Sequence, residues 1–88
     1  MTRKEVYAKL LEKYGDAQII IAIEELSELQ KELCKVLREK GVYDSVVEEI
    51  ADVEIMLEQM KMYFGIDDEE VEEVKKNKIE RTIKRLKL

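Results

Sequence analysis

The chain has 88 residues, of which 42% are charged and 45% are hydrophobic, and its formal net charge is −5. This size suits one small domain, and the acidic balance disfavours binding to nucleic-acid polymers, which requires a basic surface that contacts phosphates. The sequence contains no proline and only three glycines, a composition typical of long helices. We therefore expect a single all-α domain over residues 1–88, folded as a four-helix bundle.

No segment has the features of a membrane span or a secretion signal. The longest uninterrupted apolar run, residues 19–23, is far too short to cross a bilayer, and the first residues lack an apolar signal core. The single cysteine, Cys34, cannot form an internal disulfide, which fits a reducing compartment. We expect a cytoplasmic protein that does not associate with membranes.

The glycines divide the chain into four helical segments. Thr2 and Glu5 have the spacing of a capping box, which predicts a short first helix that begins after Thr2 and ends near Tyr14. Asp16 is expected to cap a second helix, which extends to about Glu39. This second helix carries an apolar stripe formed by Ile19, Ile23, Leu26, Leu33 and Leu37, which Ala22, Leu29 and Val36 widen.

The third helix is predicted to be capped by Ser45, with Glu48 completing another capping box. Its apolar residues recur at spacings of four and three, as at the seam of a helix bundle: Val46, Ile50, Val53, Leu57, Met60 and Phe64. The opposite side is also apolar, at Ala51, Ile55 and Met62. Because a chain this small buries limited surface alone, we expect a second subunit to cover that side, in a homodimer or homotetramer.

The fourth helix is expected to begin at Asp67, where Glu70 completes a capping box and Ile66 and Val71 occupy the positions of a hydrophobic staple. Its charges change from acidic near the N-terminus to basic near the C-terminus. The helix dipole favours this order, so a solvated surface explains these charges well.

Two acidic pairs interrupt the apolar stretches that we expect to be buried. Glu25 with Glu28, and Glu49 with Asp52, are three residues apart, so each pair presents two carboxylates on one helix face. Like charges a few ångströms apart near a low-dielectric interior repel by about 4 kcal/mol per pair. The pattern therefore predicts a cation at these carboxylates, unless they form the charged face of an interaction module.

The two pairs become level only if the connection between the second and third helices runs back along the second helix. Glu28 lies about 11 residues before the expected end of its helix and Glu49 about four after the start of the next, an offset of about 10 Å. Five extended residues can span this distance. Oxygen ligands without histidine suit Mg²⁺ or Mn²⁺, and Mg²⁺ is usually completed by substrate phosphates, which indicates a phosphate ester or anhydride as substrate.

Gln18, followed by Glu24-Glu25-x-x-Glu28-Leu29 and Glu49-x-x-Asp52-Val53, resembles the motifs of the MazG-like, all-α nucleoside triphosphate pyrophosphohydrolases. The resemblance implies a MazG-like bundle that hydrolyses the bond between the α- and β-phosphates of a nucleoside triphosphate, giving a monophosphate and pyrophosphate. It implies that Glu25, Glu28, Glu49 and Asp52 are Mg²⁺ ligands.

By the same resemblance, Glu24 orients a ligand or accepts a proton from the attacking water, although a solvated glutamate is the alternative. Gln18 is placed to face the base or sugar. Lys75, Lys78 and Arg81 are the candidates for holding phosphates, and a solvated helix face explains them equally.

Two other functions stay open at this point. A non-catalytic helical interaction module would use the apolar stripe of residues 46–64 to bind a partner and would need no metal. A phosphoribosyl-ATP pyrophosphohydrolase, in the same superfamily, resembles this chain in its size and acidic motifs.

Overall fold

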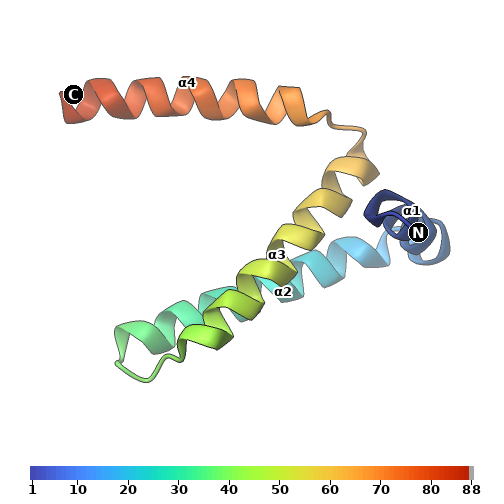
Figure 1. Ribbon diagram of the computed structural model, residues 1–88, viewed down its shortest axis with the longest axis horizontal. Helices are drawn as coiled ribbons and strands as arrows, with labels where there is room; N and C mark the ends of the chain where they lie inside the picture. Colours follow the sequence, from blue (N-terminus) through green and yellow to red (C-terminus); the bar gives the residue numbers. More distant parts are fainter. Residues whose placement is uncertain (88) are drawn as a thin grey trace.

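The computed structural model describes residues 1–87 and contains four α-helices (Figure 1). They are α1 (Arg3–Tyr14), α2 (Ala17–Leu37), α3 (Tyr43–Phe64) and α4 (Asp68–Leu86). No strand occurs among these described residues, so the all-α prediction is confirmed. None of the helices within residues 1–87 combines the length and apolar character needed to cross a bilayer.

The helices α2 and α3 form a long antiparallel hairpin, and α1 packs where the start of α2 meets the end of α3 (Figure 1). The last helix, α4, extends away from the hairpin and contains no buried residue. A single chain therefore consists of three packed helices and one projecting helix. It does not close a four-helix bundle by itself.

The helix ends follow the predicted caps in part. The backbone N–H of Glu5 donates to the Thr2 side chain at 3.1 Å, which confirms the first cap. Gly15 ends α1 with a φ of +52°, a conformation that favours glycine. Asp16 does occupy the N-cap position of α2, but its backbone is helical and its carboxylate makes no capping hydrogen bond, because it accepts one from the Tyr63 hydroxyl instead.

The third helix begins at Tyr43, three residues earlier than a cap at Ser45 predicts. Val42 occupies the N-cap position and Ser45 lies within the first turn, so the predicted Ser45 cap is wrong. At α4 the position is right, since Asp67 is the N-cap residue, but its side chain makes no capping hydrogen bond.

The connection between α2 and α3 does run back along the end of α2. The Lys40 N–H donates to the Lys35 carbonyl at 2.8 Å. Gly41 lies so close to α2 that an added Cβ would be 2.8 Å from the Cα of Val36. The second helix also ends at Leu37, before the predicted Glu39. The remaining offset along the hairpin between the acidic pair of α2 and the acidic pair of α3 is therefore small.

The seam between α2 and α3 uses a different face from the one that the apolar pattern predicted. Buried side chains are Gln18 and Ala22 on α2, and Val53, Met56 and Gln59 on α3. The predicted stripe residues Ile23, Leu26, Leu57 and Phe64 are instead 57%, 48%, 49% and 59% exposed. Small and polar residues let the two helices approach, which turns the bulky apolar residues outward. Within one chain, therefore, the predicted seam is right in part: Ala22 and Val53 are buried, and Ile19, Leu29, Val46 and Met60 are half-buried.

Candidate metal centre

Three carboxylates from the two helices of the hairpin converge at its seam. Glu25 on α2 and Glu49 and Asp52 on α3 each offer an oxygen, and these oxygens all lie within 4.8 Å of one another. Glu49 and Asp52 are one helical turn apart on the same face. The close packing of the loop at Gly41 against Val36 holds the start of α3 beside the end of α2.

The cluster is partly withdrawn from water. Glu25 and Glu49 are partly buried, and the Oε2 atom of Glu49 is excluded from solvent without a hydrogen-bond partner. Burial raises the pKa of Glu49, and the negative charge of Asp52 raises it further. Burial is also the main cause of the raised pKa of Glu25, followed by the charge of Asp52 and a hydrogen bond with it. Both carboxyl groups therefore carry an electrostatic penalty when ionised.

Among residues 1–87, no basic side chain forms an ion pair with this cluster. The ion pairs formed within residues 1–87 involve Glu32, Glu58, Asp68 and Glu72, and none includes Glu25, Glu49 or Asp52. Such a group of carboxylates has two ways to relieve its repulsion, which are to bind a cation or to retain protons. The raised pKa values are consistent with both.

The other predicted acidic residues lie beside this group. Glu28 is exposed and is not one of the three converging residues, but its negative charge contributes to the raised pKa values of both Glu25 and Glu49. Glu24 is exposed on α2. The structure thus brings three of the four predicted ligands together and places Glu28 within electrostatic range.

The sequence analysis did not select Glu32, whose charge also raises the pKa of Glu49. The side chain of Glu32 is only 13% exposed and forms an ion pair of 3.2 Å with Lys35. Glu32 lies four residues after Glu28, so the two side chains share a helix face. This spacing could have identified Glu32 from the sequence. Lys35 is therefore linked to this end of the cluster through its ion pair with Glu32.

Gln18 is buried in the same seam, two helical turns before Glu25. Its amide nitrogen donates a hydrogen bond of 2.8 Å to the Oε1 of Gln59, a residue that the sequence analysis did not select. The pair links α2 to α3 within their buried seam. Its proposed contact with a base or sugar stays a prediction.

The predicted phosphate-binding residues lie on α4, and the structure does not bring them to the carboxylates. Lys75, Lys78 and Arg81 are exposed, and α4 leads away from the hairpin (Figure 1). Lys75 forms an ion pair of 3.2 Å with Glu72 on its own helix.

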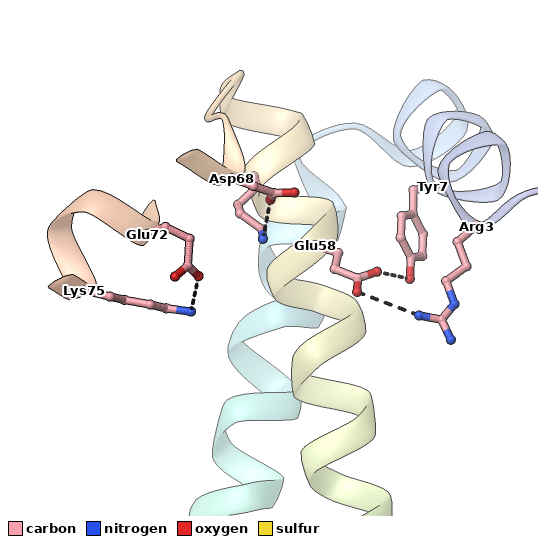
Figure 2. A network of polar contacts seen from close by, with 7 residues as sticks. Arg3, Tyr7, Glu58, Asp68, Glu72 and Lys75 are labelled. Atoms are coloured by element: carbon pink, nitrogen blue, oxygen red, sulfur yellow. Dashed lines mark hydrogen bonds and ion pairs between the residues drawn. The ribbon is translucent and has the colours of Figure 1, made fainter. Parts of the chain in front are cut away.

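A second polar cluster joins α1 to the end of α3. Figure 2 shows the Glu58 carboxylate facing both Tyr7 and Arg3, and the Tyr7 hydroxyl donates to Glu58 Oε2 at 2.5 Å. The Arg3 guanidinium is 4.0 Å from the same carboxylate, and Lys61 pairs with Asp68 at 2.7 Å. Each acid in this cluster has a partner. The contacts of Glu58 with Tyr7 and Arg3 attach α1 to α3, and this attachment explains the cluster.

Comparisons with protein-family models, with curated proteins and with solved structures find no match to this chain. What the fold and the site define is an all-α protein with a carboxylate cluster between two antiparallel helices. A function is therefore inferred from the chemistry of that cluster.

Proposed function

We propose that this chain is a Mg²⁺-dependent nucleoside triphosphate pyrophosphohydrolase, which cleaves the α–β phosphoanhydride bond to give a nucleoside monophosphate and pyrophosphate. The observation that carries the proposal is the convergence of Glu25, Glu49 and Asp52 within 4.8 Å without a basic partner. The resemblance of their motifs to those of MazG-like enzymes supplies the reaction.

The donor set fits a hard divalent cation. Mg²⁺ and Mn²⁺ prefer carboxylate oxygens, and a dication would offset the repulsion that raises the pKa of Glu25 and Glu49. The buried Oε2 of Glu49, which has no hydrogen-bond partner, is a natural ligand atom. When bound, the metal supplies charge neutralisation and polarisation of the phosphates.

Glu25, Glu49 and Asp52 hold the cation in this proposal, and Glu28 completes the ligand set from the adjacent turn of α2. Water attacks the α-phosphorus, the bond from that phosphorus to the bridging oxygen breaks, and pyrophosphate leaves. Glu24, next to the cluster on α2, orients a ligand or accepts the proton of the attacking water. Gln18 approaches the base or sugar.

Self-association is part of this proposal. The large apolar residues exposed on the outside of the hairpin, among them Ile23, Leu26 and Leu57, need cover that one chain does not provide. Because α4 leads away from its own hairpin, its basic residues most simply reach phosphates at the carboxylate cluster of another copy. These residues are Lys75, Lys78 and Arg81. We propose a homodimer or homotetramer that works in the cytoplasm.

The test is pyrophosphate release from a panel of standard and modified nucleoside triphosphates and from phosphoribosyl-ATP, each with Mg²⁺, Mn²⁺ or EDTA. Asp52→Asn is expected to abolish release. Glu54→Gln, an exposed residue on the same helix, is the matched control and should keep it. Release from phosphoribosyl-ATP alone would assign the histidine-pathway activity instead.

A non-catalytic interaction module is the second candidate, and the exposed apolar side chains of the hairpin favour it. This candidate predicts no pyrophosphate release from any substrate and no rise in melting temperature with Mg²⁺ or Mn²⁺. Both results together would overturn the hydrolase proposal.

A further inference from the structure

Lys35 is the one basic side chain, among residues 1–87, whose ion pair leads to the carboxylate cluster. Its Nζ lies 3.2 Å from Oε1 of Glu32, and the charge of Glu32 helps to raise the pKa of Glu49. The other ion pairs formed by these residues lie on α1, α3 and α4. Their acids are not among the main charges that raise the pKa of Glu25 or Glu49. Lys35 therefore brings a positive charge to the edge of an otherwise acidic site.

The burial of Glu32 distinguishes this contact from an ordinary surface ion pair. An exposed glutamate and lysine one turn apart on a helix commonly pair and contribute little to stability. Here the Glu32 side chain is only 13% exposed, whereas that of Lys35 is 37% exposed. On a helical wheel Glu32 lies between Glu28 and Glu25, and the carboxylate of Glu25 meets those of α3. The pair therefore holds the Lys35 ammonium beside the carboxylate cluster, with part of its surface open to a ligand.

We propose that Lys35 binds the phosphates beyond the α-phosphate, and so fixes the direction in which the substrate lies on the hairpin. This inference rests on the proposed function. Gln18, which the proposed function assigns to the base or sugar, lies on the N-terminal side of the cluster along α2, and Lys35 lies on its C-terminal side. A nucleoside triphosphate in this direction has its base toward α1 and its terminal phosphates toward the loop at Gly41.

The reach of a lysine side chain fits this role. Lys35 follows Glu28 by two turns of α2, or about 10 Å along the helix axis. Helical side chains point back toward the N-terminus, so the ammonium lies nearer to the cluster than the Cα of Lys35 does. An ammonium has several N–H donors, so it can hold a phosphate oxygen while it remains paired with Glu32. Lys35 also acts within a single chain, whereas the basic residues of α4 need a second copy.

Calorimetry of the full chain in excess Mn²⁺ tests this assignment, with tripolyphosphate and inorganic phosphate as the probes. Lys35→Met should bind tripolyphosphate about tenfold more weakly than the parent, because it loses one charge-assisted contact, and should bind inorganic phosphate equally well. Lys35→Arg, which keeps the positive charge, should retain most of the affinity. Lys9→Met is the matched control, because Lys9 is exposed on α1 and its loss changes the net charge by the same amount. This control should bind both probes as the parent does.

Equal tripolyphosphate affinity in Lys35→Met and the parent, an equal loss in Lys9→Met, or no binding by the parent would overturn the assignment. So would an equal loss for inorganic phosphate, because it would place Lys35 at the first phosphate.

The melting temperature in Mn²⁺ alone checks the proposed function separately. A rise in both the parent and Lys35→Met would show that both chains fold and bind the metal, so that a change in tripolyphosphate affinity reports on Lys35. No rise in the parent would overturn the metal site and this assignment with it.

Discussion

The amide of Gln18 on α2 donates a hydrogen bond of 2.8 Å to Oε1 of Gln59 on α3, and both side chains are buried. These two residues are far apart in the sequence, and their contact links the two helices that carry the carboxylates. The hydrogen bond matters because a buried amide that loses its partner keeps its full desolvation cost.

Gln18→Leu is therefore expected to lower the free energy of unfolding by about 1–3 kcal/mol, because it leaves Gln59 buried without that partner. The double variant Gln18→Leu and Gln59→Leu should recover much of the loss, since two apolar side chains of similar size need no hydrogen bond. Urea unfolding of the three variants measures this coupling. Additive losses would mean that the hydrogen bond contributes nothing beyond packing.

Replacing Glu49 by Gln should separate metal binding from folding. The change removes a carboxylate whose ionised form is penalised by burial and by Asp52, so the metal-free chain should be as stable as the parent or more stable. Mg²⁺ should raise the melting temperature of the parent and not of the variant, and hydrolysis should fall by about a hundredfold or more. Glu54→Gln, exposed on the same helix, serves as the control. A large loss of metal-free stability in Glu49→Gln would point to a structural role for this carboxylate.

The metal-free chain should become more stable as the pH falls toward the unfolded-state pKa of glutamate, about 4.3. In the folded state the pKa values of Glu25 and Glu49 are higher than in the unfolded state. At a pH between the unfolded and the folded pKa, the folded chain therefore binds more protons than the unfolded chain. Their destabilising contribution is absent below the unfolded pKa and complete above the raised one. Melting temperatures in EDTA test this, with Glu49→Gln expected to show a weaker dependence. A steady loss of stability as the pH falls over this range would contradict the burial of Glu25 and Glu49.

Gly41→Ala should disturb the register of the hairpin. A Cβ at this position would meet the Cα of Val36 at 2.8 Å and lie closer still to Val36 Cγ2, so the backbone must move. Gly65→Ala is the comparison, because its Cβ meets no atom and its φ of +67° costs only about 1–2 kcal/mol. We expect a larger stability loss and weaker Mg²⁺ binding for Gly41→Ala, by urea unfolding and calorimetry. Equal effects of the two variants would show that the loop does not set the register.

Some of the fold and the site was accessible from local pattern alone. Thr2 and the glycines at positions 15 and 65 end or begin helices through short-range chemistry, which acts between residues a few positions apart. The spacings of Glu25 with Glu28 and of Glu49 with Asp52 place carboxylates on common helix faces for the same reason. Asp16 makes no capping hydrogen bond and Ser45 is not at the N-cap position, because neighbouring backbone and tertiary contacts outweighed a side-chain preference, as the hydrogen bond from Tyr63 to Asp16 illustrates.

The sequence by itself determined that the chain is helical, where its loops fall and which acidic residues share a face, because these properties depend on residues close together in the chain. Only the tertiary structure decided that Glu25 meets Glu49 and Asp52, that Gln18 pairs with Gln59, and that Ile23 and Leu57 face outward. Those contacts depend on the register and rotation of α2 against α3. An apolar pattern does not specify that rotation when both sides of a helix are apolar, and here the small and polar residues made the closer seam.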